Sequence, residues 1–345
     1  MQKRITHINF AKGFRGGERQ TLLLIQELSN RGYSQQILTR QNSTLALKLQ
    51  GIKNLDIIQI AKPYILHLRH IKDTSLLHAH ETKGAQFALF ANLIYKIPYI
   101  ITRRVDNPIK NNFFNQKLYQ NTYRTVALSS AIQNETLKIN KAINIEIIPS
   151  AYSDLTIDHS KVKVIQERFK DKFLIANIGE LDNAHKGQYY LIEAMKELQK
   201  KYPNIHLLLL GKGKDQANYE AQAKGVKNIT FEGFVDNVGD YLQAIELFVF
   251  PSLHEGLGSI LFDVMRSNVP IIASNVGGIP DIIEQHKNGI LVAPKDTHAL
   301  YQAIEKLYLN QSLRESFVQE AKKSVENFSY TKMCDRYALL YKGVL

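Results

Sequence analysis

The sequence has a single cysteine, Cys334, and no apolar run long enough to cross a membrane. One thiol cannot build a disulfide framework or a thiolate metal cluster, so Cys334 is expected to be a small buried apolar side chain. The opening residues MQKRITHINF contain charges too early, and too short an apolar run, for a secretory signal peptide. These absences predict a cytoplasmic protein.

Acidic residues are scarce in the first half of the chain. Residues 1–150 contain 21 Lys and Arg against 8 Asp and Glu, whereas residues 151–345 contain 23 and 24. The excess positive charge of the first half indicates an anionic partner: nucleic acid, an acidic membrane surface or a phosphorylated substrate. No helix-turn-helix, RNA-recognition sequence or interleaving of aromatic and basic residues supports nucleic acid, which is therefore not expected as a partner.

Short β-rich apolar runs alternate with longer helical patterns along the whole chain. Such alternation predicts parallel sheets covered by helices on both faces, and two series of this length predict two doubly wound, Rossmann-like α/β domains. Ligands of such sheets bind beyond the carboxyl ends of the strands, so the expected site is a cleft between the domains. The predicted strands are 5–10, 35–40, 55–60, 76–80, 98–103, 125–129, 145–150, 173–179, 206–211, 228–233, 247–252, 270–275 and 289–294, and the clearest helices of the first half are 17–30 and 84–96.

A domain boundary is expected near residues 147–154, where a strand ends in Pro-Ser and polarity rises. We expect an N-terminal acceptor-binding domain over 1–150 and a C-terminal nucleotide-sugar domain over 151–326. Residues 327–345 have apolar positions at helical spacing and are expected to form a helix that packs back on the N-terminal domain.

The stretch LHEGLGSILFD, residues 253–263, follows a buried strand and leads into a helix predicted over 259–268. Its glycines allow a ligand close to the backbone, and the helix start offers free amides that suit a phosphate. Glu255 can accept hydrogen bonds from sugar hydroxyls, and Asp263, about one turn into the helix, can bind the diol of a ribose. This combination indicates a nucleotide sugar.

The frame P-S-x-x-E-G-x-G-x-x-x-x-[DE] around these residues resembles the signature of retaining glycosyltransferases of family 4, the glycosyl transferases of group 1, as found in bacterial lipopolysaccharide and polysaccharide synthesis. The resemblance covers almost the whole chain and implies the GT-B fold. Its other motifs are Gly16-Gly17-Glu18-Arg19, His78-Ala79-His80, Ser129-Ser130-Ala131, IPSAYSD (148–154), GELDNAHKG (179–187), Gly211-Lys212-Gly213 and GGIPD (277–281).

The resemblance implies roles for individual residues. Lys186 would neutralise the donor diphosphate, Glu255 would hold the donor sugar and His80 would lie beside the transferred sugar, and these three are the expected catalytic residues. Neither a metal nor a cofactor is expected, and the expected donor is a UDP- or GDP-sugar. The expected donor-binding residues are Gly16, Gly17, Gly211, Gly256, Leu257, Gly258, Ser259 and Asp263, and the expected acceptor-binding residues are Arg15, Arg103 and Arg104.

The chain departs from the family pattern at three places. Glu180 stands where the family commonly has an arginine that binds the diphosphate, and Arg103-Arg104 stands where many relatives have a histidine. The family usually has Glu at the position of Asp263. Arg15, Arg19, Arg103, Arg104 or Lys212 could supply the missing cation.

Simpler interpretations remain open for several of these residues. Glu255 could cap the following helix, Asp263 could be an ordinary first-turn acid, and Lys186 could be a solvated turn lysine. His78 and His80 alternate along one strand and could ligate a metal, but the sequence shows no third ligand that completes the pair.

The sequence thus predicts a retaining glycosyltransferase that moves a sugar to a hydroxyl of a surface glycan or lipid-linked acceptor. The basic first half predicts peripheral association with the inner face of the cytoplasmic membrane. A sugar-nucleotide epimerase of the same architecture is the alternative, although no acid–base pair for it is evident in the sequence.

Overall fold

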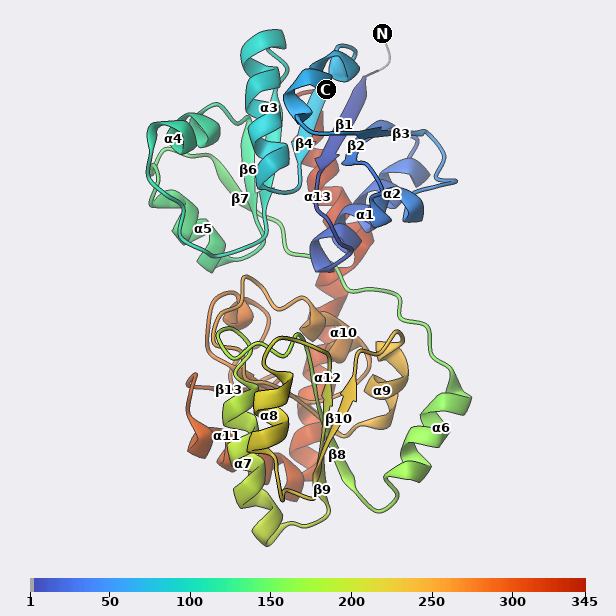
Figure 1. Cartoon of the computed structure of the whole chain (residues 1–345), viewed down its shortest axis with the longest axis vertical. Helices are drawn as coiled ribbons and strands as arrows, with labels where there is room; N and C mark the ends of the chain where they lie inside the picture. The colour runs from blue at the N-terminus through green and yellow to red at the C-terminus, as the bar shows by residue number, and fades with distance from the viewer. Residues whose placement is uncertain (1–2) are drawn as a thin grey trace. The chain divides into compact units, whose positions relative to one another are not determined.

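The computed structural model describes residues 3–345 and divides the chain into two units. The first unit contains the chain up to Ala151 together with Phe328–Leu345, and the second contains Tyr152–Asn327. Each unit is built on one parallel β-sheet with helices on both faces (Figure 1). No helix among the described residues is both long enough and apolar enough to span a bilayer.

The first unit contains a seven-stranded sheet in the order β3-β2-β1-β4-β5-β6-β7. Every neighbouring pair is parallel, and His7 of β1 lies opposite His78 of β4. The elements are β1 (Arg4–Asn9), α1 (Gly16–Asn30), β2 (Ser34–Arg40), α2 (Thr44–Lys48), β3 (Leu55–Ile60), the 3-10 helix η1 (Tyr64–Ile71), β4 (Leu76–Ala79), α3 (Thr82–Tyr95), β5 (Tyr99–Arg103), α4 (Phe113–Gln120), β6 (Arg124–Ala127), α5 (Ser130–Leu137), β7 (Ile145–Ile147) and α13 (Tyr330–Lys342).

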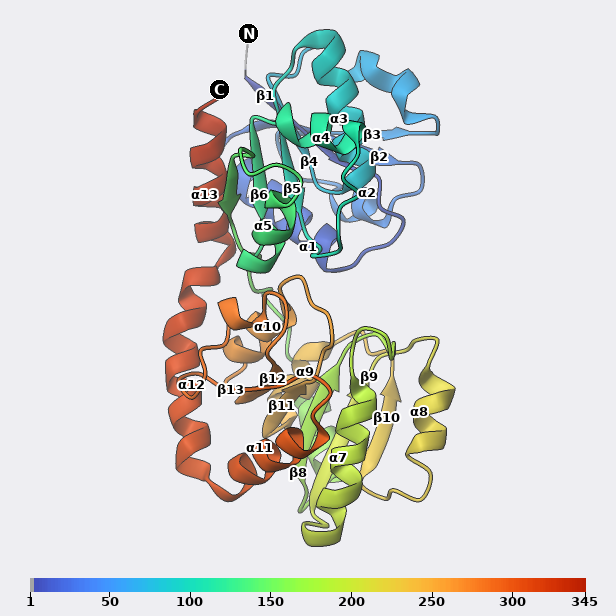
Figure 2. The same cartoon turned by 90° about the vertical axis from the view of Figure 1, so that its left-hand side faces the viewer.

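Two apolar cores cover the two faces of this sheet. On one face α3, η1 and α4 pack over alternate strand residues such as Ile8 and Ala79. On the other face α1 and α13 pack over Ile5, Leu76 and Ile100, and Figure 2 shows α13 running beside the sheet opposite α3. Helix α13 therefore forms part of the first unit although residues 152–327 separate it from the rest of that unit.

The second unit contains a six-stranded parallel sheet in the order β10-β9-β8-β11-β12-β13. Helices α7, α8 and α11 bury one face over strand residues such as Ile175, Leu207 and Val249. The elements are α6 (His159–Arg168), β8 (Phe173–Ile178), α7 (Gln188–Lys201), β9 (Ile205–Leu210), α8 (Gln216–Gln222), β10 (Ile229–Gly233), α9 (Val238–Ala244), β11 (Leu247–Phe250), α10 (Ile260–Arg266), β12 (Ile271–Ser274), η2 (Ile279–Asp281), β13 (Ile290–Val292), α11 (Thr297–Leu309), α12 (Gln311–Val325) and η3 (Glu326–Phe328).

In both sheets the strand order reverses beside the first strand, so each unit has the doubly wound arrangement that the alternating pattern predicts. The predicted strands all occur, with ends that differ by at most three residues. The helix predicted over 259–268 is shorter, at Ile260–Arg266, because Asn268 adopts a left-handed backbone conformation with φ 61°.

Candidate functional site

Two loops meet at the carboxyl ends of β8 and β11, which are neighbouring strands of the second sheet. The first loop, 179–187, leads from β8 to α7, and the second, 251–259, leads from β11 to α10. The backbone amides of Leu253 and His254 both donate to the carbonyl of His185, at 2.7 and 3.2 Å. These hydrogen bonds fix the loops to each other.

Gly187 makes this close approach possible. It precedes α7 with φ +64°, a conformation that favours glycine. A Cβ atom at this position would lie 2.0 Å from the carbonyl oxygen of Pro251, so any side chain would push the loops apart. The glycine after Lys186 is therefore a geometric requirement of the two-loop arrangement.

The side chains of Lys186 and Glu255 form an ion pair between these loops. Lys186 Nζ lies 2.7 Å from Glu255 Oε2, and it also lies 5.6 Å from the centre of the Phe250 ring. The two side chains are 25% and 18% exposed, so the pair is largely shielded but remains open to a ligand. The structure thus brings together two of the three residues predicted to be catalytic.

The glycine-rich part of the second loop follows Glu255 directly. Gly258 has φ +84°, and a Cβ atom there would lie 3.4 Å from Glu255 Cγ. Leu257 is buried, so only its backbone can face a ligand, and Ser259 is the N-cap of α10 without a side-chain cap bond. The carbonyl of Glu255 accepts a hydrogen bond from the amide of Gly278, which ties the GGIPD motif to the same loop.

Asp263 lies within α10 and is 6% exposed. Its Oδ1 accepts a hydrogen bond of 2.6 Å from the backbone amide of Ser153, in the segment that follows the unit boundary. The side chain also lines a cavity of about 220 Å³ with Ser153, Asp154 and Arg266. Asp263, which is predicted to bind ribose, therefore holds a backbone segment in this structure.

Gly211 and Glu180 lie at the ends of β9 and β8. A Cβ atom on Gly211, which has φ +140°, would lie 1.9 Å from the carbonyl oxygen of Gly179, so this glycine lets the two strand ends pack closely. Glu180 itself is exposed. Lys212, which follows Gly211 and is one of the residues suggested to replace the missing arginine, is also exposed.

In the first unit, Gly16 and Gly17 begin α1, and Arg15 is the exposed residue before them. Glu18 is buried, and its carboxylate accepts a hydrogen bond of 2.9 Å from the amide of Arg15. A Cβ atom on Gly17 would lie 3.1 Å from Arg104 Cδ. The predicted Gly-Gly motif and the predicted arginine pair therefore lie side by side.

Arg103 ends β5, and Arg104 follows it. Both line a cavity of about 420 Å³ at the carboxyl ends of β4 and β5, together with His80, Glu18 and Glu81. Arg103 Nη1 lies 3.3 Å from the hydroxyl of Tyr119, and its other terminal nitrogen donates to the carbonyl of Asn107. The structure thus brings His80, Arg103 and Arg104 to one cavity.

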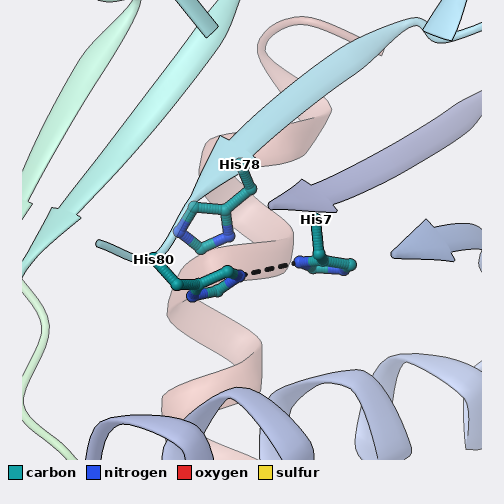
Figure 3. A group of neighbouring side chains, drawn as sticks. All are labelled: His7, His78 and His80. Carbon is teal, nitrogen blue, oxygen red and sulfur yellow. Dashed lines mark hydrogen bonds between the residues drawn. The ribbon is translucent and has the colours of Figure 1, made fainter. Parts of the chain in front are cut away.

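A cluster of three buried histidines lies beside this cavity (Figure 3). His7 joins His78 and His80, because β1 and β4 pair with His7 opposite His78. The sequence-based conclusion that no third ligand accompanies the pair was wrong. It failed because the register between two parallel strands far apart in the sequence is not visible in the sequence itself.

All six ring nitrogens of this cluster have polar partners. His7 Nδ1 bonds His80 Nε2 at 3.0 Å, as the dashed line in Figure 3 shows. His78 bonds the hydroxyls of Tyr341 and Thr102, at 2.6 and 2.7 Å. The remaining partners are Gln35 for His7 and Arg104 for His80. The three histidines thus form a fully hydrogen-bonded network next to the guanidinium group of Arg104.

Burial holds these histidines in the neutral form. Desolvation lowers the pKa of His7 to about 4, while its hydrogen bond to Gln35 opposes the shift. Desolvation also lowers the pKa values of His78 and His80 well below the usual value, and neighbouring histidines and Arg104 add to the effect. His80 is therefore a neutral hydrogen-bonding group at neutral pH.

Residues 158–324, which make up most of the second unit, match the family described as glycosyl transferases group 1. The chain is a glycosyltransferase, and its match to group 1 lies in the second unit. It is 25% identical over 353 residues to the lipopolysaccharide core biosynthesis glycosyltransferase LpsE of Rhizobium meliloti, covering 98% of each chain. It is 26% identical over 216 residues to the capsular polysaccharide biosynthesis glycosyltransferase CapM of Staphylococcus aureus, covering 59% of this chain and 56% of that protein.

Solved structures of similar fold cover almost the whole of this glycosyltransferase. The Anabaena protein Alr3699/HepE in complex with UDP-glucose matches over 99% of both chains, with a TM-score of 0.86 and 16% identity. The lipopolysaccharide outer core galactosyltransferase WaaB matches with a TM-score of 0.77 and 16% identity over 99% of this chain and all of that one. These similarities confirm the predicted GT-B fold, and the family matches do not favour the epimerase alternative.

Proposed function

We propose that this glycosyltransferase transfers a sugar from a UDP- or GDP-sugar, with retention of anomeric configuration, to a hydroxyl of a surface glycan or lipid-linked acceptor. The ion pair between Lys186 and Glu255 at the carboxyl ends of β8 and β11 is the observation that carries this proposal. A relative named for lipopolysaccharide core synthesis, and a similar structure that contains UDP-glucose, support the acceptor and donor classes.

In this proposal each residue of the pair has its own task. The Lys186 ammonium stabilises negative charge on the diphosphate as the bond between the anomeric carbon and the phosphate oxygen breaks. Glu255 accepts hydrogen bonds from hydroxyls of the donor sugar and orients it. The amides of Gly256 to Ser259 bind the sugar and phosphate, and Asp263 binds the ribose.

Retention follows if the acceptor hydroxyl attacks from the face that the diphosphate leaves. The leaving phosphate oxygen takes the acceptor proton, so charge and atoms balance without a protein nucleophile. No metal is required, because Lys186 and backbone amides supply the positive charge. The acceptor lies in the basic first unit, beside His80, Arg103 and Arg104.

Ligand binding to the native state raises its apparent stability, so a thermal-shift screen of UDP-, GDP-, ADP- and CMP-sugars tests the donor. We expect a UDP- or GDP-sugar to raise the melting temperature of the wild-type protein and to raise it less in Glu255→Ala. The configuration of the product follows from proton NMR of the anomeric position. Stabilisation by none of the four nucleotides would contradict the proposal.

We also propose that the first unit associates with the anionic inner face of the cytoplasmic membrane. Helix α3 contacts both η1 and α4, and apolar side chains on these three elements are exposed, with Leu66 at 71% and Phe113 at 74%. This apolar surface is completed by Ile65, Phe90, Leu93, Ile94 and Phe114, and the exposed lysines Lys62, Lys83, Lys110 and Lys117 lie on or next to the same elements.

An apolar surface among lysines suits an acidic bilayer, because the apolar groups enter the interface and the lysines meet lipid phosphates. Flotation with liposomes of anionic phospholipid tests this association. We expect binding at low salt that weakens as salt rises, and weaker binding in the Leu66→Ser/Phe113→Ser variant. Leu309→Ser, at an exposed leucine of the second unit, is the matched control. Absence of flotation at low salt would remove the membrane part of the proposal.

A further inference from the structure

We propose that the cavity at the carboxyl ends of β4 and β5 binds an oxyanion, a phosphate or carboxylate group carried by the sugar acceptor. This inference rests on the proposed placement of the acceptor in the first unit. It adds the chemical class of the acceptor, because a cavity that binds a neutral glycan has no need of two adjacent guanidinium groups.

Each of the two arginines has hydrogen bonds from its terminal nitrogens but keeps a buried Nε without a partner. Arg103 Nε and Arg104 Nε are both buried and have no hydrogen-bond partner among residues 3–345. Within the same described residues, neither guanidinium lies within 4.0 Å of a carboxylate, the limit for an ion pair. Burial lowers the pKa of Arg104, and the nearby Tyr337 and Glu18 only partly oppose the shift. An anionic ligand would complete this arrangement.

The acids that border the cavity already have other partners. Glu81 accepts hydrogen bonds from the amides of Gly84 and Lys83, at 2.6 and 2.7 Å, and so caps α3. Glu18 accepts from the amide of Arg15 at the start of α1. Lys110 adds a third positive charge to the lining. The cations therefore outnumber the acids, and the acids are held at helix ends.

A chain of hydrogen bonds orients the side chain of Arg104. The amide nitrogen of Gln35 donates to the carbonyl of Ile25 at 3.0 Å, so its oxygen accepts from His7 Nε2 at 3.1 Å. His7 Nδ1 is then an acceptor, and His80 Nε2 donates to it. These partners assign the His80 proton to Nε2 and leave Nδ1 as an acceptor.

His80 Nδ1 lies 3.4 Å from Arg104 Nη2, which donates to it. This contact fixes one end of the guanidinium and leaves its other terminal nitrogen for a ligand. His7 and His80 are thus positioning residues for Arg104. Their neutral state matters, because a protonated His80 would repel the guanidinium.

Helix α1 adds to the positive potential. Its first turn packs against Arg104, since a Cβ atom on Gly17 would lie 3.1 Å from Arg104 Cδ. The 15-residue helix presents its N-terminus there, which favours an anion. The planar guanidinium suits two oxygens of a phosphate or carboxylate, and about 420 Å³ is enough for a small ligand such as one charged sugar.

Calorimetric titration of the full chain tests the inference, with saturating UDP present so that the proposed donor site is occupied. The ligands are glucose 6-phosphate, glucuronate and glucose. We expect at least one of the anions to bind and glucose not to bind. Binding of glucose 6-phosphate alone assigns a phosphate, and binding of glucuronate alone assigns a carboxylate.

Arg104→Gln should weaken binding of the anion about tenfold or more, as expected for loss of a charged hydrogen-bond donor. Arg69→Gln, at an exposed arginine of η1 that does not line the cavity, should bind as the wild type does. If Arg104→Gln fails to fold, as judged by circular dichroism, Arg103→Gln replaces it with the same expectation.

Equal binding of glucose and both anions, or unchanged affinity in the arginine variants, would overturn the oxyanion site. So would failure of both anions to bind the wild type. The proposed donor site is judged separately, by the titration of UDP into the same protein. If UDP does not bind the wild-type protein but an anion does, the result counts against the donor proposal alone.

Discussion

Lys186 Nζ and Glu255 Oε2 lie 2.7 Å apart and join two loops that follow neighbouring strands of the second sheet. We expect Lys186→Ala and Glu255→Ala each to lower the transfer rate about 10²-fold or more, because each removes a preorganised charged group. Stability should change little, since a partly exposed ion pair contributes about 1 kcal/mol or less.

Lys201→Ala is the control for these variants, because Lys201 forms an exposed ion pair with Glu305 elsewhere in the second unit. It should retain wild-type transfer. Turnover close to normal in either Lys186→Ala or Glu255→Ala, measured with the donor found by thermal shift, would show that the pair is not part of the active site.

Two substitutions at Asp263 separate its structural contact from its proposed contact with ribose. Asp263→Asn keeps an oxygen that can accept from Ser153, so it should fold normally but bind the nucleotide about tenfold more weakly. Asp263→Ala leaves the Ser153 amide without this acceptor and should lower the free energy of unfolding by about 1–3 kcal/mol as well. Urea denaturation and UDP titration measure the two effects, and wild-type UDP affinity in Asp263→Asn would leave Asp263 a structural residue only.

Substitution of Gly187 should damage both stability and activity. An added Cβ would meet the carbonyl of Pro251 at 2.0 Å, so Gly187→Ala must separate the loops that position Lys186 and Glu255. Gly225→Ala is a matched control, because Gly225 also has positive φ, +84°, but open space around it. We expect the control to cost about 1–2 kcal/mol from backbone strain alone and to keep full activity. Equal effects of the two substitutions on transfer would contradict this account.

The buried histidines should make stability depend on pH. His7 is neutral when folded, with a pKa lowered to about 4, but titrates near its ordinary value when unfolded. The contribution of each such histidine to the free energy of unfolding is therefore fully present above pH ~6.5. It is lost as the pH falls toward 4, by up to about 1.4 kcal/mol per pH unit. His78 and His80, which face His7 and Arg104, act in the same direction.

Urea denaturation at pH 7.5 and 5.5 measures this dependence. His7→Gln should reduce the loss of unfolding free energy between these pH values by the amount expected for one titrating histidine. His286→Gln, at an exposed histidine, should leave that loss unchanged. An unchanged pH dependence in His7→Gln would show that His7 is not held neutral.

The fold could be predicted from the sequence because the alternation of apolar strands and helical segments is repeated in each unit. Residues that cap helices also indicated where several helices begin or end. Glu81 caps α3, which begins at Thr82, two residues before the predicted start at residue 84, and Asn268 follows α10 in a left-handed conformation. The loop around Glu255 could be placed at a strand end for the same reason.

The histidine cluster and the orientation of the Arg104 side chain could not be predicted from the sequence. They depend on β1 pairing with β4, on Gln35 from β2 and on Tyr341 from α13, which are far apart in the sequence. Only a contact across the sheet shows that His7 completes the group. The role of Asp263 in holding Ser153 has the same origin, since it joins a helix to the start of the second unit.

The discontinuous first unit has a consequence for biogenesis. The ribosome adds residues 328–345 only after the whole of 152–327, so the second unit can fold while the first still lacks α13. Until then His78 has no tyrosine hydroxyl from Tyr341, and the apolar surface formed by Ile5, Leu76 and Ile100 lacks its cover. A nascent chain stalled before residue 328 should therefore bind chaperones more strongly than the full-length chain does.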